Sequence, residues 1–419
     1  MKLNSLNYFF FFQVPYFLVI SLPLLLITGS FLPDLAISLI ALSFIIYSIK
    51  YREYQYYKGL FFKFFLIFCA LLLICSLLSN NILLSFQSSL FYFRFGIFSL
   101  GFLFLIKNKK NIFFYLFISF LIFFLLLIFD SFIQYFYDKN ILGWNLVESG
   151  RVSSFFGNEL ILGSYISRLI PIFSGLYYLN KNIRNNTYLN FLFIITHGLS
   201  GVVIFLSGER SSFFYFILYS FIVLFLISKN NIRTFLISSF ISFLIISVFI
   251  VLDTNPKKRI IDQTISGFKE IGNNEKYMFT RIHQQHYNTA LKMFKSNKFF
   301  GVGPKNFRVE CNKVEYNSGP ASCTTHPHNT YIQLLAETGI FGFLFVFLIF
   351  LTLSFFLLIH FYNKFVRKFL YFNDFQICII SSILITTWPL TSSGSFFHNW
   401  LCIIYFIPVG LLLSSLKKS

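Results

Sequence analysis

Long apolar runs, separated by short polar stretches, repeat along almost the whole chain. About twelve runs stand out, and most approach the ~20 residues that a helix needs to cross the hydrocarbon of a bilayer. Two are weaker, because 34–49 is short and 375–390 carries Trp388 and Pro389 near its end. The runs lie near 10–28, 34–49, 60–79, 88–106, 112–129, 158–179, 190–206, 211–228, 233–252, 333–359, 375–390 and 398–415. The pattern predicts an all-α polytopic membrane protein with one transmembrane domain over residues 1–419.

Composition supports lipid as the solvent of this chain. Hydrophobic residues make up 56% of it and charged residues only 12%, which leaves too little polar surface to coat a soluble globule of 419 residues. The run 113–129 is apolar on every side, as a helix among acyl chains requires. We therefore exclude a soluble protein and expect membrane lipids as partners.

The distribution of Lys and Arg predicts the orientation. With the N-terminus in the cytoplasm, most basic residues fall in inner turns, such as 50–63, 107–110 and 364–368, and few in the short outer ones. The positive-inside rule then places both termini in the cytoplasm of a bacterial inner membrane. The net charge of +19 does not indicate nucleic-acid binding, because anionic lipid accounts for the basic inner turns.

The long segment 253–328 is predicted to be a periplasmic loop subdomain between the ninth and tenth helices. It contains a candidate loop helix over 280–298, whose apolar residues suit a membrane surface and whose basic residues suit solvent equally well. Cys311 and Cys323 both lie in this loop, where an oxidising compartment favours a disulfide; two free thiols are the alternative.

Charged residues within or next to the apolar runs gather at the predicted outer side. Arg151, Arg168 and Arg210 all belong there, and no comparable set exists at the inner side. Charges are costly in a membrane unless they face a cavity or a partner, so these arginines are candidates for function. Arg210 lies in the tight turn 208–211; the simpler interpretation is an arginine that only reaches the lipid head groups.

The segment 326–342 is the richest in polar signals. Pro327 keeps His326 out of a helix, and Asn329 is a predicted N-cap for the apolar helix that follows. His328 is thereby placed at the positive end of that helix. The histidines His283, His286, His326 and His328 can alternatively bind a metal, but the chain has no Asp-x-Asp or Asp-Asp pair to help them, so we expect neither metal nor cofactor.

These segments resemble the O-antigen ligase and polymerase superfamily of membrane glycosyltransferases, the Wzy_C type. The segment 326–329, followed by 334–339 and Gly342, is similar to that family's histidine-asparagine motif and the helix after it. Supporting segments in the expected order are 151–158, 207–211, and Arg281 followed by 300–307. The resemblance spans most of the chain and implies a fold of the GT-C glycosyltransferase kind.

The resemblance implies transfer of a glycan from undecaprenyl diphosphate, at the periplasmic face, to an acceptor, which in ligases is a sugar of the lipid A core. Arg210 and Arg281 are then expected to bind the diphosphate, because arginine contacts phosphate oxygens bidentately and keeps its charge. His328 is the candidate base for the acceptor hydroxyl, and direct displacement would invert the anomeric centre. The expected substrate-binding residues are Arg151, Arg168, His326, Asn329 and Glu337.

Several alternatives stay open on the sequence. For Glu337 the alternative is a buried ion pair that fixes helix packing. An O-antigen polymerase would use the same donor at the same face, and a protein O-oligosaccharyltransferase is a related enzyme, although ligase is favoured. A secondary transporter is the non-enzyme alternative; it would place ionisable residues near the midplane, often in two related halves, which this sequence does not show.

Overall fold

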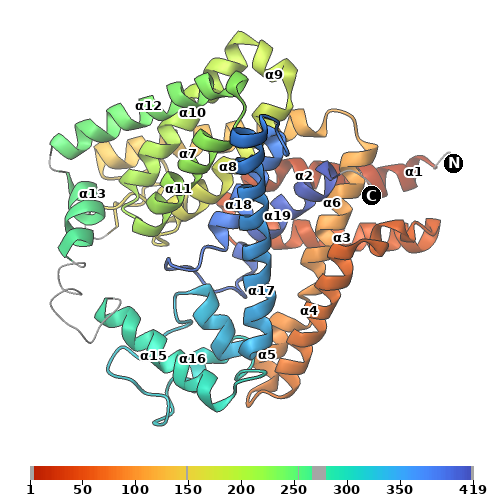
Figure 1. Cartoon of the computed structure of the whole chain (residues 1–419), viewed down its shortest axis with the longest axis vertical. Helices are drawn as coiled ribbons and strands as arrows, with labels where there is room; N and C mark the ends of the chain where they lie inside the picture. The colour runs from red at the N-terminus through yellow and green to blue at the C-terminus, as the bar shows by residue number, and fades with distance from the viewer. Residues whose placement is uncertain (1–3, 148–149, 253, 267–279, 417–419) are drawn as a thin grey trace.

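The computed structural model describes residues 4–147, 150–252, 254–266 and 280–416, and helices dominate these ranges (Figure 1). Only two isolated β-bridges occur in them, Lys139 with Asn145 and Val147 with Arg151. The all-α prediction is confirmed. The helices are α1 (Ser5–Tyr8), α2 (Val14–Leu25), α3 (Phe31–Tyr51), α4 (Leu60–Leu77), α5 (Ile82–Ser89), α6 (Phe93–Asn108), α7 (Ile112–Tyr137), α8 (Leu162–Leu179), α9 (Lys181–Asn185), α10 (Thr187–Leu206), α11 (Arg210–Leu226), α12 (Lys229–Val251), α13 (Asn255–Lys257), α15 (Arg281–Ser296), α16 (Phe307–Glu310), α17 (Thr330–Tyr362), α18 (Asp374–Thr386) and α19 (Asn399–Ser415).

Every predicted apolar run overlaps a helix, but the helices differ in length. In the part of the chain that the structure describes, 8 helical segments are long and apolar enough to cross a membrane, while α11, α18 and α19 are shorter apolar helices. α18 ends at Thr386 because Trp388 precedes Pro389, which disfavours helical backbone at that position. The chain is therefore a multi-pass membrane protein, and the count of twelve spans stays a prediction.

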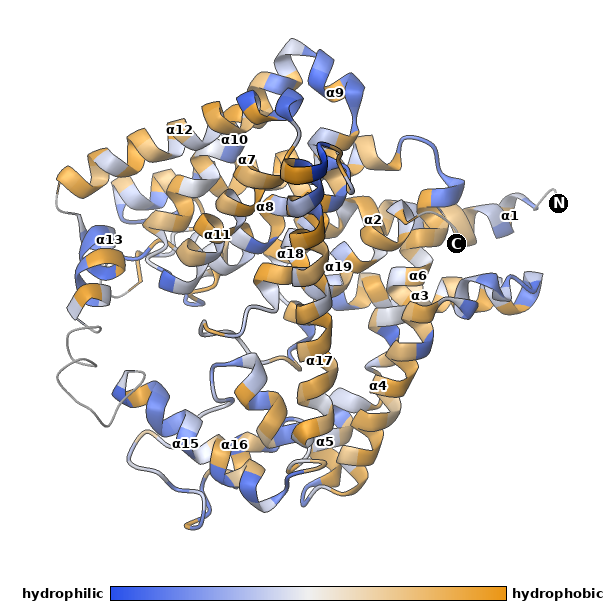
Figure 2. Cartoon of the chain, viewed as in Figure 1, coloured by the Kyte–Doolittle hydropathy of each residue, from blue (hydrophilic) through white to orange (hydrophobic). Residues whose placement is uncertain are grey.

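The centre of the bundle is α8, which packs against α7, α10, α11 and α18. Nearly every residue of α8 is buried, including Arg168. Outer helices instead leave large apolar side chains uncovered, as Phe240 and Phe243 of α12 do, and Figure 2 shows the hydrophobic colour along these helices. An exposed apolar surface of this extent suits lipid.

The helix α17 breaks at Gly339, where the backbone takes φ 64° and ψ −162°. The freed backbone groups bind the segment 298–303: the carbonyls of Ala336 and Glu337 accept hydrogen bonds from Val302 (2.9 Å) and Gly303 (3.0 Å), and Ile340 donates to Lys298 (2.8 Å). A Cβ at position 339 would meet the carbonyl of Phe299, so glycine is required there. The break thus fixes the segment before α16 against the start of α17.

The predicted loop 253–328 contains its own packed elements in its described parts. Helix α15 matches the expected loop helix, and its buried face, with Tyr287, Ala290 and Met293, lies against α17. Ala290 and Met293 join a small hydrophobic cluster with Phe307 of α16 and Ala336 of α17. Figure 1 shows α15 and α16 beside the beginning of α17. The apolar residues of α15 are therefore used largely in protein packing.

Candidate active site

The two histidines of the predicted motif lie immediately before α17. His328 has a left-handed backbone, with φ 56°, and Asn329 caps the helix by accepting hydrogen bonds from Tyr331 (3.0 Å) and Ile332 (3.1 Å). The predicted N-cap is confirmed. The Asn329 amide also donates to the carbonyls of Pro389 (2.8 Å) and Thr391 (3.2 Å), so its hydrogen-bonding groups are engaged within the protein.

Four imidazole rings gather at this point. The ring centroid of His328 lies 4.3 Å from that of His326, 5.5 Å from His286 and 5.8 Å from His283. The segment 391–395 holds the pair in place, because Ser393 donates its N–H to the His328 carbonyl (2.9 Å) and its carbonyl lies 3.3 Å from His326 Nε2. We call these four residues the histidine cluster.

The histidine cluster is uncharged at neutral pH. Burial, followed by repulsion from His283 and His286, lowers the pKa of His328 to about 4. Burial and the neighbouring His328 lower the pKa of His326 to about 3. Both imidazoles can therefore accept a proton at working pH.

A second group of functional side chains surrounds the turn between α10 and α11. Arg151 donates from Nε to the carbonyl of Ser207 (2.9 Å), and Arg259 donates from Nε to the carbonyl of Gly208 (3.1 Å). Arg210 is exposed at the first residue of α11. Burial, then repulsion from Arg259 and partly from Arg210, lowers the pKa of Arg151 to about 10. We call Arg151, Arg210 and Arg259 the arginine turn.

Glu209 anchors this turn rather than neutralising it. Its carboxylate accepts hydrogen bonds from the backbone of Gly163 (2.7 Å) and Ser164 (3.0 Å) and from the Ser212 hydroxyl (2.9 Å). These contacts tie the turn to the beginning of α8. The carboxylate interacts with Arg151 and Arg168, while Arg210 and Arg259 add further positive charge at the turn.

The arginine turn and the histidine cluster are neighbours. After burial and the effect of His286, repulsion from Arg210 lowers the pKa of His283, whose ring contacts that of His328. Arg210 is thus linked to His328 through His283, while Arg151 interacts with Arg210 and the ring of His326 lies beside that of His328. Two members, His283 and His286, were considered in the sequence only as metal ligands.

The remaining predicted residues lie in other surroundings. Arg281 is exposed at the first residue of α15. Arg168 is 2% exposed, binds the Ser164 carbonyl (3.0 Å) and stacks over the Tyr215 ring at 4.8 Å. Glu337 is completely buried and accepts hydrogen bonds from Gln333 (2.9 Å) and the Phe307 backbone (3.2 Å), a position that favours packing over substrate contact.

Arg259 was missed by the sequence reasoning. It ends a run of three basic residues, 257–259, in which no feature of the sequence separates it from the two lysines. Tyr215 was missed as well; its hydroxyl lies 2.5 Å from that of Thr391, which links α11 to the segment that holds the histidines. Neither residue could be identified from the sequence, because the partners of both are distant along the chain.

The disulfide Cys311–Cys323 closes the segment just before the histidines, with Cα atoms 5.0 Å apart. Among the residues that the structure describes, no group of three or more His, Cys, Asp or Glu side chains is arranged to hold a metal ion.

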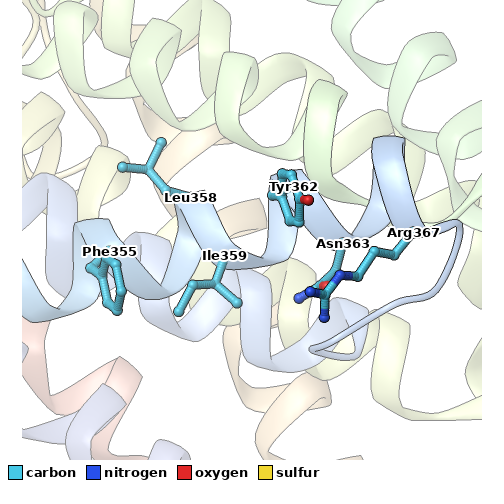
Figure 3. Close-up of a pocket in the computed structure, with 6 residues that line it drawn as sticks. All are labelled: Phe355, Leu358, Ile359, Tyr362, Asn363 and Arg367. Atoms are coloured by element: carbon cyan, nitrogen blue, oxygen red, sulfur yellow. The ribbon is translucent and has the colours of Figure 1, made fainter.

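An apolar depression lies at the opposite end of α17, between Phe355, Leu358, Ile359, Tyr362, Asn363 and Arg367 (Figure 3). From Ile340, just after the break at Gly339, to Phe355 the helix rises about 22 Å, at ~1.5 Å per residue. This depression is therefore separate from the histidine cluster.

The fold and site together define a multi-pass helical membrane protein with cationic and imidazole side chains gathered at one end of its bundle. Residues 195–347 match the family model Wzy_C, described as O-antigen ligase. The resemblance to the O-antigen ligase and polymerase superfamily is thereby confirmed. The matched segment includes Arg210, Arg259 and the whole histidine cluster, whereas Arg151 lies outside it. No curated protein matches the chain. Members of this family are glycosyltransferase-like enzymes that act on polyprenyl-linked glycans.

Proposed function

We propose that this protein is an O-antigen ligase of the bacterial inner membrane, which transfers a glycan from undecaprenyl diphosphate to a lipid A core sugar at the periplasmic face. The observation that carries the proposal is the juxtaposition of the arginine turn with the neutral histidine cluster. A diphosphate leaving group needs cations, and an attacking sugar hydroxyl needs a base. Both are present side by side.

The arginine turn suits the diphosphate of the donor. As the bond between the anomeric carbon and the phosphate oxygen breaks, negative charge grows on that oxygen. Arg210 is exposed, while Arg151 and Arg259 are oriented by their Nε hydrogen bonds to the turn, and their terminal nitrogens are proposed to bind phosphate. We assign the same role to Arg281 because it lies at the start of α15.

His328 suits the role of base for the acceptor hydroxyl. As the acceptor oxygen bonds to the anomeric carbon, its proton passes to the imidazole, and the diphosphate leaves with the electrons of the broken bond. Attack opposite the leaving group inverts the anomeric centre. A bound diphosphate would raise the low pKa of His328 towards neutrality, because a neighbouring anion favours imidazolium. The base would thus become stronger when the donor is bound.

The other predicted residues support this arrangement. Arg168, stacked on Tyr215, and Asn329, bonded to 389–391, hold α8, α11 and the histidine segment together. His326 is placed to contact the acceptor next to His328. Glu337 supports the arrangement indirectly, through its contacts within the helix packing.

The proposal is tested in cells that lack this protein, by gel and mass-spectrometric analysis of lipopolysaccharide and of undecaprenyl-linked glycans. Complementation with the wild type should restore polymer on the core lipid, and Arg210→Ala should leave the polymer on the carrier. Arg367→Ala, a matched loss of an arginine at the opposite end of α17, should restore the wild-type pattern.

The same analysis separates the alternatives. Core lipid that carries a single repeat in the deleted cells would instead show a polymerase. A glycoprotein lost in those cells, with normal lipopolysaccharide, would show a protein-directed transferase. Unchanged glycans in all pools would overturn the glycosyltransferase proposal and leave transport as the alternative.

A further inference from the structure

A second group of basic side chains lies on the other side of the histidine cluster. It consists of Lys305, Arg308 and His398, of which the first two flank the start of α16 and the third precedes α19. None of them belongs to the arginine turn. We call these three residues the second basic group.

The buried pair Gln333 and Glu337 positions this group. The Glu337 carboxylate accepts backbone hydrogen bonds from Lys305 and Phe307, the latter at 3.2 Å. Gln333 donates to Glu337 (2.9 Å) and accepts from the backbone of Phe396 (2.8 Å), in the segment that leads to His398. One helix face of α17 therefore holds both segments, which come from distant parts of the sequence.

The charges of the second basic group are not balanced by their surroundings. Burial and then repulsion from Arg308 lower the pKa of Lys305. Burial and then repulsion from Lys305 lower the pKa of His398, although Glu159 acts in the opposite direction. Positive groups that repel one another across a partly exposed surface are stabilised by an anion.

Nearby acidic groups supply only part of that negative charge, through Glu337 on Lys305 and Glu159 on His398. Glu337 is bonded to the backbone and to Gln333, and Glu310 is engaged by Lys313 (2.7 Å) and Asn80 (3.2 Å). Arg308 keeps a buried Nε that has no hydrogen-bond partner among the described residues. An unsatisfied buried donor of this kind is costly unless a ligand completes it.

The two basic sites act on different members of the histidine cluster. After burial and the effect of His286, the charge of Arg210 lowers the pKa of His283, and the His283 ring centroid lies 5.8 Å from that of His328. The His328 ring lies 4.3 Å from that of His326, on which Arg308 and His398 act. The order is thus arginine turn, His283, His328, His326 and second basic group. A donor at one side and an acceptor at the other would meet at His328.

We propose that Lys305, Arg308 and His398 form a second anion site, which binds the phosphate of an anionic glycolipid acceptor and presents its sugar hydroxyl to His328. This inference rests on the proposed function and names its acceptor class. Two sources share this chemistry: a phosphate on the lipid A core, or the diphosphate of a second carrier-linked glycan.

The test uses the full-length protein in lipid vesicles with a labelled undecaprenyl diphosphate-linked glycan and a lipid A core glycolipid. In Lys305→Gln/Arg308→Gln the KM for the acceptor should rise ~10-fold or more, since two charge-assisted contacts are lost, while the donor KM stays unchanged. The control Lys295→Gln/Lys298→Gln removes the same charge from exposed positions of the same loop and should leave both KM values unchanged. His398→Ala, at an exposed position, should raise the acceptor KM about 3-fold and serves if the double variant misfolds.

An acceptor without phosphate distinguishes the two possible ligands, the core phosphate and the diphosphate of a second carrier-linked glycan. If its KM with the wild-type enzyme matches that of the double variant with the intact acceptor, the core phosphate is the ligand. If dephosphorylation changes nothing but a second diphosphate-linked glycan is elongated, with its KM raised in the variant, the second carrier is the ligand. A double variant that alters the donor KM, or neither KM, overturns the second site and leaves the proposed function intact.

A direct binding measurement tests the second anion site even if the proposed function is wrong. If the wild type transfers no glycan, binding of intact and dephosphorylated glycolipid to the protein in nanodiscs is compared. Phosphate-dependent binding that the double variant loses would support the second site by itself. Equal binding by wild type and double variant would overturn it.

Discussion

The two ends of the bundle treat buried polar groups in opposite ways. At the predicted inner end, the Asp374 carboxylate accepts from the Ser228 backbone (2.8 Å), the Ser228 hydroxyl (2.5 Å) and the Asn231 amide. His360 lies 3.1 Å from the Leu226 carbonyl through Nε2 and accepts from the Phe372 backbone (2.9 Å) at Nδ1. Asp374 and His360 thus have their hydrogen-bond partners within the protein.

At the predicted outer end, basic side chains are gathered instead. The arginine turn offers three guanidiniums against one committed carboxylate, and the histidine cluster packs four imidazoles together. Satisfied polar networks stabilise a fold, whereas groups held together against their mutual repulsion await a ligand. We therefore assign the proposed chemistry to the outer end, and the contrast between the two ends can be tested residue by residue.

The largest difference is expected between His328 and His360. His328→Ala should reduce glycan transfer ~10²-fold to 10⁴-fold, the usual effect of losing a general base, with little change in thermal stability. His360→Ala should lower the Tm, because buried backbone groups lose their partner, while transfer per folded molecule stays near wild type. Transfer assays on purified protein, with Tm measured in the same detergent, check both. Full activity of folded His328→Ala would remove this histidine from the mechanism.

A smaller effect on glycan transfer is expected at Arg259. Two substitutions there distinguish the contribution of its charge from that of its packing. Arg259→Ala should reduce transfer ~10-fold to 100-fold through lost stabilisation of the diphosphate. Arg259→Lys, which keeps the charge but not the fork of nitrogens, should recover part of that loss. Arg367→Ala at the inner end is the control. A loss in Arg259→Ala that occurs only through a lower yield of folded protein would indicate a structural role for the Gly208 contact.

The smallest effect is expected in the dependence on pH. Because the pKa of His328 is lowered to about 4, the free enzyme should keep its neutral base from pH 7 down to about pH 5. The kcat/KM should therefore fall only as the pH drops through about 4, rather than through the ordinary 6.5 of histidine. The stability contributed by this neutral, buried histidine should decline between pH 6.5 and about 4, where only the unfolded chain gains the proton. A kcat/KM profile that falls near 6.5 would contradict the burial of His328.

Much of the architecture could be read from the sequence because apolar runs act locally. A helix in lipid satisfies its own backbone, so composition alone predicts each apolar segment, and every predicted run overlaps a helix. Asn329 was also predictable, since an N-cap depends on residues two or three positions away. The motif histidines and Arg210 stood out because polar groups are rare in such a chain.

The roles within the site were decided only by the tertiary structure. Arg259 and Lys305 look like any other basic residues of a loop until the turn at Gly208 and the carboxylate of Glu337 bring partners from elsewhere in the chain. Glu337 is buried and bonded to Gln333 and Phe307, contacts that only the structure shows, and its expected contact with substrate stays a prediction. Local patterns determine where helices form, but the direction and partners of a charged side chain depend on contacts between distant segments, which no local pattern encodes.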